Sequence, residues 1–177
     1  MTFQLFSIRT MKHAAVVAAM SLSAHAGATT PPNANTAGQA KSTAHPSTSA
    51  KANTALVQQA FDNWKAGTGT VFDLLSDDAV WTVAGVSPVS GTYDNRQALI
   101  DGAVRPIHDM LSTPITPEVK HIVAQGDNVV VLWDGTATAK DGSIYNNSYA
   151  WHLVMQQDQI TQVTAFLDTW NLVELMQ

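Results

Sequence analysis

Two side chains in the C-terminal half of the chain have the chemistry of an acid–base pair. Asp134 and His152 stand in two long runs rich in Val, Thr and aromatic residues, which predict neighbouring β-strands joined by a turn at residues 140–142. If that turn is a three-residue loop, Asp134 lies opposite Ser148, and alternation puts both on the face of His152. The backbones of Asp134 and His152 would then be within about 7–8 Å, so the carboxylate could raise the basicity of the imidazole.

The same residues fit other interpretations. Asp134 could be the base itself, if burial raises its pKa. It could equally be a solvated aspartate near a strand end, with His152 hydrogen-bonded in the core. A two-residue loop would instead move Asp134 to the other face, opposite Tyr149.

The strands that carry this pair belong to a predicted three-stranded meander from Asn128 to Thr169. Its runs cover residues 129–139, 143–156 and 159–168, and strands of this length twist, so one face becomes a concave wall. A two-residue turn at 157–158 would place Ala150 opposite Ala165. One face would then carry Leu132, Asp134, Thr136, Ser148, Ala150, His152, Val163, Ala165 and Leu167. The other would carry Trp133, Tyr145, Asn147, Tyr149, Trp151, Phe166 and Asp168.

The elements that must position the meander precede it in the chain. Apolar residues at helical spacing predict helices over 54–66, 70–75 and 94–111, the last kinked at Pro106. Shorter runs predict strands over 79–84 and 119–124. The order α-α-β-α-β-β-β-β predicts an α+β domain, with three N-terminal helices packed on a strongly curved, mainly antiparallel sheet.

Composition limits the function classes. The chain has 177 residues, 13% of them charged, and a formal net charge of −5 without a basic cluster, so nucleic acid and anionic membranes are poor partners. The chain has no cysteine, which excludes disulfides and thiolate nucleophiles. The remaining candidate ligands do not assemble into a metal site, and no phosphate-binding or dinucleotide motif appears, so neither metal nor cofactor is expected.

The N-terminus has the pattern of an export signal. Residues 1–26 combine a basic start, a short apolar run at 14–22 and the small-residue site Ala24-His25-Ala26, although Met11 could be the true start. The run is too short to span a membrane. Residues 27–53 are rich in Ala, Thr, Ser, Asn and Pro, and predict a disordered linker. Residues 54–177 would then form one exported domain, periplasmic or secreted, without a membrane span.

Short motifs follow one another along this domain. They are Asp-Asp-Ala-Val-Trp at 77–81, Pro-Val-Ser-Gly at 88–91, Asp141-Gly142 with Tyr145 and Asn147, and residues 160–169 ending in Phe-Leu-Asp-Thr. In this order they resemble the SnoaL-like branch of the nuclear transport factor 2-like superfamily. Its relatives include polyketide cyclases, ketosteroid isomerases and limonene epoxide hydrolases.

The resemblance implies a conical domain with an apolar pocket between the helices and the concave sheet, commonly in a homodimer. It places the face of Asp134 in the pocket and the aromatic face outside, where a large apolar patch would form the dimer interface. The predicted ligand contacts are Phe61, Trp64, Trp81, Val83, His108, Ser148, Ala150, Ala165 and Leu167.

Two activities of the relatives are not matched by the residues. A ketosteroid isomerase needs a base, a tyrosine donor and a protonated acid, but the corresponding positions hold Thr82, Ala60 or Phe61, and Ala150. A limonene epoxide hydrolase needs two acids bridged by an arginine. Asp134 matches one acid, whereas Leu132 and Ala165 occupy the other two positions.

Three functions therefore stay open. The first is an exported SnoaL-like domain that holds a small apolar molecule without catalysis. The second is an isomerase- or cyclase-type enzyme in which Asp134 and His152 transfer a proton. The third is a non-catalytic dimeric interaction module.

Overall fold

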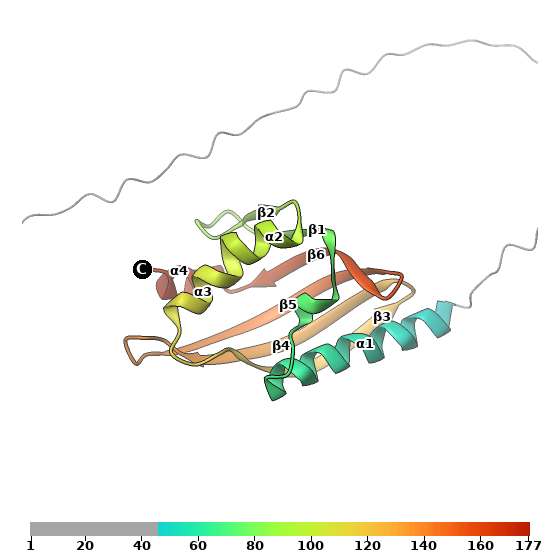
Figure 1. The fold of residues 1–177 in the computed structure, drawn as a ribbon, viewed down its shortest axis with the longest axis horizontal. Coiled ribbons are helices and arrows are strands. Elements are labelled where there is room, and N and C mark those ends of the chain that lie inside the picture. The colour runs from blue at the N-terminus through green and yellow to red at the C-terminus, as the bar shows by residue number, and fades with distance from the viewer. Residues whose placement is uncertain (1–45) are drawn as a thin grey trace, which may run out of the picture. The chain divides into compact units, whose positions relative to one another are not determined.

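The computed structural model describes residues 46–177, which form the expected α+β domain around a six-stranded curved sheet (Figure 1). The strand order is β2-β1-β6-β5-β4-β3, and every neighbouring pair is antiparallel except β1 and β6. The strands are β1 (Leu75–Val83), β2 (Gly91–Tyr93), β3 (Thr116–Gln125), β4 (Asn128–Thr138), β5 (Ile144–Gln156) and β6 (Gln159–Leu167).

The hairpin between β4 and β5 has the register expected from its three-residue loop. Asp134 pairs with Ser148, and the N–H of Ala139 donates to the carbonyl of Ser143 at 2.8 Å. Gly142 adopts a φ of 89°, a left-handed conformation that glycine reaches at little cost. The first two long strands of the meander are therefore placed correctly by their turn residues.

The hairpin between β5 and β6 departs from the expected register. Gln156 pairs with Gln159 as predicted, but the pairing then shifts, so that Met155 faces Ile160 while Val154 faces Gln162. The extra residue in β6 reverses which face its later side chains occupy. Trp151, not Ala150, consequently lies opposite Ala165.

The assignment of the two sheet faces from the resemblance was wrong. The helices cover the aromatic face, on which Trp133 and Trp151 are only 2% and 4% exposed. Leu132, Asp134 and Ser148 point away from the helices. Two large rings at neighbouring positions stabilise the domain most when a second layer covers them, because burial of aromatic surface contributes strongly to folding.

Helix α1 (Pro46–Ala66) begins inside the stretch that was expected to be a linker. It lies along β3 and β4 in Figure 1 and contacts both strands. The buried side chain of Asn53, just before the expected helix start, donates from Nδ2 to the carbonyl of Gly126 at 3.1 Å. The expected signal segment at 1–26 and the linker up to residue 45 lie outside the described residues.

The third predicted helix is divided into three parts: α2 (Arg96–Leu99), the π-helical turn η2 (Ile100–Val104) and α3 (Arg105–Met110). Asn95 caps it, because the Oδ1 of Asn95 accepts from the N–H of Ala98 at 2.8 Å. Pro106 lies in the first turn of α3. Since proline lacks an N–H and crowds the carbonyl four residues earlier, the π turn stands where the kink was predicted.

Three further elements differ from the sequence-based prediction. The second helix is a single 3₁₀ turn, η1 (Val71–Leu74), and β1 begins at Leu75, earlier than the strand predicted over 79–84. A short C-terminal helix, α4 (Thr169–Leu175), was not predicted. Asp168 caps α4 by accepting from the N–H groups of Trp170 and Asn171 at 3.0 and 3.3 Å.

Candidate ligand-binding site

Aromatic rings from five elements meet on the helix-covered face of the sheet. We call them the aromatic cluster: Phe61 and Trp64 of α1, Phe72 of η1, Trp81 of β1, Trp133 of β4, and Tyr149 and Trp151 of β5. The cluster lies within the main hydrophobic core. It therefore joins the helical layer to the centre of the sheet.

Cross-strand pairing sets the geometry of these rings. Trp133 and Tyr149 are direct partners across β4 and β5, and their rings stack with centroids 3.9 Å apart and planes 7° from parallel. Trp151 meets Trp133 edge to face at 4.7 Å and Trp81 at 4.8 Å. Stacked and edge-to-face contacts are both favourable for aromatic quadrupoles, so the rings hold one another in fixed orientations.

A glycine allows the stacked pair to sit close to the sheet. A Cβ added to Gly135 would lie 3.0 Å from Cζ3 of Trp133 and 3.1 Å from Cε2 of Tyr149. Both rings thus pack against bare backbone at this position. A glycine inside a predicted strand is a signal of close approach that could have located this part of the site from the sequence.

Three rings of the aromatic cluster keep part of their surface exposed to solvent. Phe61, Trp81, Trp133 and Trp151 are buried, whereas Trp64, Phe72 and Tyr149 are half-buried. Leu167, which pairs with Tyr149 across β5 and β6, is also half-buried on this face. In Figure 1, α1 lies along the β3–β4 side of the sheet and α2 lies near β1 and β2.

Two polar atoms within the aromatic cluster have no hydrogen-bond partner. The indole Nε1 atoms of Trp133 and Trp151 are buried, and neither finds an acceptor among residues 46–177. A buried donor that loses its hydrogen bonds to water costs about 1–3 kcal/mol. Buried polar groups without a hydrogen-bond partner are rare in folded proteins.

A chain of hydroxyl and amide groups borders the rings. The buried Asn147 donates from Nδ2 to the hydroxyl of Tyr145 at 3.0 Å, and the hydroxyls of Tyr145 and Tyr149 are 2.9 Å apart. Burial raises the pKa of Tyr149 and of Tyr145, so both phenols keep their protons at neutral pH. Because two phenols carry two protons and their shared hydrogen bond uses one, one O–H donor is left over.

The predicted ligand contacts fall on both sides of the sheet. Phe61, Trp64 and Trp81 belong to the aromatic cluster, and Val83, Ala165 and Leu167 pack against the same core. Ser148 and Ala150 point to the outer face, and His108 is exposed on α3, so these three were placed in the pocket wrongly. Trp133, Tyr149 and Trp151 were assigned to the outside and belong to the inner face.

The predicted acid–base pair is not formed. In the observed register Asp134 pairs with Ser148, whereas His152 pairs with Val130, so the two lie well apart on the outer face. The ring Nε2 of His152 is 2.9 Å from Oδ1 of Asn128. The Oδ1 of Asp134 accepts from the hydroxyl of Ser148 at 2.7 Å.

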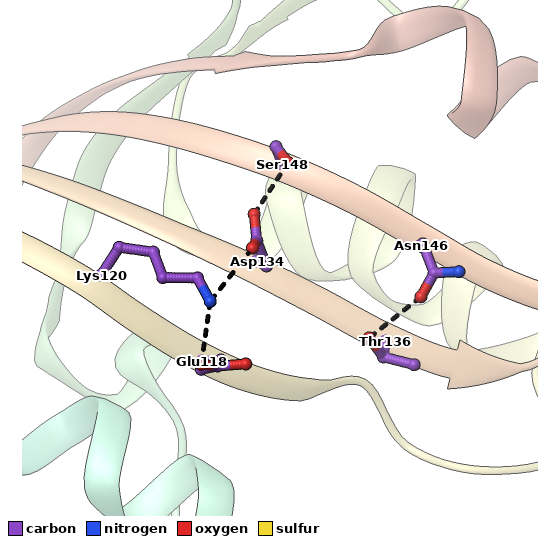
Figure 2. Close-up of polar contacts among 6 residues, drawn as sticks. All are labelled: Glu118, Lys120, Asp134, Thr136, Asn146 and Ser148. Atoms are coloured by element: carbon purple, nitrogen blue, oxygen red, sulfur yellow. Dashed lines mark hydrogen bonds and ion pairs between the residues drawn. The ribbon is translucent and has the colours of Figure 1, made fainter.

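Asp134 belongs instead to an exposed ionic network, drawn in Figure 2. Lys120 lies 2.8 Å from Glu118 and 3.4 Å from Asp134. The hydrogen bond from Ser148 lowers the pKa of Asp134, and Lys120 adds to the effect. The carboxylate is therefore ionised at neutral pH, and the raised pKa expected for a buried base is wrong.

An open depression of about 550 Å³ lies elsewhere on the domain, lined by Asp77, Arg96, Gln97 and Ile100. It shares no residue with the aromatic cluster. Within the described residues, no group of three or more His, Asp or Glu side chains is placed to hold a metal ion. None of the helices in residues 46–177 combines the length and apolar character that a membrane crossing requires.

Comparison with solved structures finds the same fold in proteins of low sequence identity. A protein from a soil-derived mobile gene cassette aligns with a TM-score of 0.61 at 17% identity, over 73% of this chain and 99% of its own. A protein named as a SnoaL-like polyketide cyclase, from Jannaschia sp. CCS1, gives 0.59 at 15% identity, over 78% and 97%. TerC, co-crystallised with polyporic acid, gives 0.57 at 17% identity, over 70% and 97%.

Sequence comparison identifies the family directly. No curated protein matches the chain. The family model of the SnoaL-like domain matches residues 57–163, which run from α1 through the β5–β6 hairpin and include the whole aromatic cluster. The chain therefore belongs to the SnoaL-like domain family.

Proposed function

We propose that this domain binds a small, largely apolar ring compound against the aromatic cluster, without transforming it. The observation that carries the proposal is that three rings of the cluster, Trp64, Phe72 and Tyr149, keep part of their apolar surface exposed. Apolar walls with a few polar groups are typical of small-molecule sites. A relative of the same fold, TerC, was co-crystallised with polyporic acid, which supports a ligand of this kind.

The polar side chains that are buried in residues 46–177 favour binding over proton-transfer chemistry, because they are amides and hydroxyls. Among the described residues these are the side chains of Asn53, Ser76 and Asn147, together with the tyrosine hydroxyls beside the cluster. An acid–base catalyst needs a carboxylate or imidazole within reach of its substrate. Asp134 and His152, the candidates for that role, point away from the ring cluster.

The binding proposal can be tested with tetralin, a hydrocarbon of two fused rings. Tetralin is expected to bind the full chain saturably, and Trp64→Ala is expected to weaken binding about tenfold or more because it removes one of the partly exposed rings. Isothermal titration calorimetry measures both. Trp170→Ala, which removes an exposed tryptophan outside the aromatic cluster, is the matched control. Equal affinity in all three proteins would contradict the proposed location.

We also propose that two copies of the domain associate through the outer face of the sheet. The apolar patch on this outer face is smaller than the sequence predicts, because Trp133, Tyr149 and Trp151 lie on the inner face. It still exposes Val123, Leu132 and Phe166, the last by 53%. Apolar side chains gathered on one face of a sheet are typical of an interface.

Replacing Phe166 with Arg is expected to give a monomer, because the guanidinium would lose its hydration inside an apolar interface. Light scattering over a range of concentrations measures the mass. Val86→Arg is the control, since Val86 is fully exposed in the loop between β1 and β2 and lies outside the sheet. A wild-type protein that stays monomeric at high concentration would refute the dimer.

We further propose that the chain is exported and that residues 1–26 are removed, as the basic start, the apolar run and the site at Ala24–Ala26 indicate. The mature protein would then begin at Gly27. N-terminal sequencing of the protein from its natural host checks this. Intact Met1 or Met11 on protein from the cytoplasm would disprove export.

A further inference from the structure

We propose that the open depression between β1 and α2 binds an apolar α-amino acid in its zwitterionic form. Arg96 holds the carboxylate of this ligand, Asp77 holds its ammonium group, and Ile100 contacts its side chain. The depression shares no residue with the aromatic cluster, so this inference goes beyond the proposed function and does not depend on it.

The size and the charges of the depression are the first support. Its volume of about 550 Å³ lies within the range of small-molecule sites. Asp77 of β1 and Arg96 of α2 both line it, and within residues 46–177 no ion pair joins the two side chains. Opposite charges that border one hollow without pairing leave room for a molecule that pairs with both.

A bulge in β1 presents the carboxylate of Asp77. Four residues of β1, 76–79, lie between two ladder pairs that enclose a single residue of β6. Ser76 and Ala79 are buried at the ends of this bulge, whereas Asp77 and Asp78 between them are exposed. Asp78 accepts a hydrogen bond from the hydroxyl of Ser76 at 2.8 Å, but no side chain in residues 46–177 pairs with Asp77. Bulges often re-aim a side chain beside a functional site.

Arg96 has donors available for a ligand. Its one ion pair in the described part of the chain is with Asp73 at 3.7 Å, which is longer than a hydrogen bond. A guanidinium carries five N–H donors, and a carboxylate can accept from two of them side by side. Asp73 also accepts from the N–H of Thr70 at 2.6 Å and from the Thr70 hydroxyl at 3.3 Å. A ligand carboxylate can therefore replace Asp73 at Arg96 without leaving Asp73 unpaired.

Ile100 gives the depression an apolar wall beside the arginine. The N–H of Ile100 donates to the carbonyl of Arg96, so the two side chains lie one turn apart on the same face of the helix. The π-helical turn η2 begins at Ile100, and such turns are frequent at functional sites. A ligand whose carboxylate is bound at Arg96 would bring an apolar group on the next carbon atoms against Ile100.

The charges also select against molecules that carry only one charge. A simple anion would pair with Arg96 but would lie beside the carboxylates of Asp77 and Asp73, which repel it. A simple cation would pair with Asp77 but would lie beside the guanidinium. A zwitterion is the class of small molecule that pairs with both walls of the depression.

Three probes of related shape test the proposal: L-leucine; 4-methylpentanoate, which lacks the ammonium group; and 3-methylbutylamine, which lacks the carboxylate. We expect L-leucine to bind the full chain saturably, and each single-charge probe to bind about tenfold more weakly or worse, because it loses a charge-assisted contact. Titrations followed in ¹H–¹⁵N spectra suit weak ligands and give the affinities. L-leucine should move the backbone signals of residues 76–78 and 96–100 and leave the indole signals of Trp133 and Trp151 in place.

Arg96→Gln and Asp77→Asn keep the approximate shape of each side chain and remove its charge. Each is expected to weaken binding of L-leucine about tenfold. The matched controls are Arg105→Gln and Asp109→Asn, which remove exposed charges from α3 outside the depression and should leave the affinity unchanged. Thermal unfolding of the four variants shows that each is folded.

The outcomes separate this inference from the proposed function. Saturable binding of L-leucine that weakens in Arg96→Gln and Asp77→Asn, but not in the two controls, supports the inference. Equal binding of L-leucine and a single-charge probe, equal affinity in the wild type and Arg96→Gln, or no binding of L-leucine at all would overturn it. Each of these results leaves the proposed function standing, because that function is measured with tetralin and Trp64→Ala at the aromatic cluster.

Discussion

Replacing Trp133 with alanine is expected to lower the free energy of unfolding by about 3–5 kcal/mol, the usual cost of deleting a buried large ring. Trp133 is almost fully buried and contacts four other rings of the aromatic cluster, at centroid distances from 3.9 to 5.5 Å. Small domains are stable by only about 5–15 kcal/mol. Urea denaturation followed by circular dichroism should therefore show a large shift of the midpoint.

A matched tryptophan tests whether this loss comes from the cluster. Trp170, on α4, is 62% exposed, and Trp170→Ala should change stability by no more than about 0.5 kcal/mol. Trp133→Phe should fall between the two, because it keeps a smaller ring in the stack with Tyr149. Similar midpoints for Trp133→Ala and Trp170→Ala would show that Trp133 does not lie in the core, and the assignment of the sheet faces would fail.

The sequence was sufficient where a local signal decides the structure. Gly142 fixes the loop between β4 and β5, because its left-handed φ closes a three-residue turn, and the pairing of Asp134 with Ser148 follows from it. Pro106 likewise locates the irregularity in the third helix. The family resemblance, carried by the order of short motifs, correctly gave the α+β class and the curved sheet.

The sequence was not sufficient in β6, where one extra residue changes the sheet face that the later side chains occupy. The turn at Gln157 and Asp158 was predicted, and both residues have positive φ. The register shift that follows it has no turn residue to mark it, so Ala165 was paired with Ala150 instead of Trp151. Because side chains alternate with a period of two, a one-residue bulge exchanges the faces of every later residue in the strand.

The predicted acid–base pair of Asp134 and His152 is wrong for a different reason. Alternation reveals two faces but not which one is covered, and a row of Tyr and Trp residues suits a core as well as an interface. The distance was also misjudged: His152 pairs with Val130, four strand positions from Asp134, which is about 13 Å at the rise of a β-strand. Gly135 was the signal that could have corrected the face, since only the face with close packing needs a residue without a side chain.

Replacing Asn147 with alanine is expected to cost about 2–4 kcal/mol, because one buried amide satisfies several groups on neighbouring elements. Its Nδ2 donates to the Tyr145 hydroxyl and to the carbonyl of Asp168 at 2.9 Å, and its Oδ1 accepts from the N–H of Asp168. Alanine would leave these buried or half-buried partners without hydrogen bonds, each at a cost of about 1–3 kcal/mol before solvent relieves part of it.

The neighbouring asparagine is the control for this change. Asn146 points to the outer face, where its Oδ1 accepts from the hydroxyl of Thr136 at 3.0 Å in full contact with solvent (Figure 2). Asn146→Ala should therefore change the urea midpoint little, since water replaces the lost partner. Equal midpoints for the two variants would mean that Asn147 does not link β5 to the start of α4.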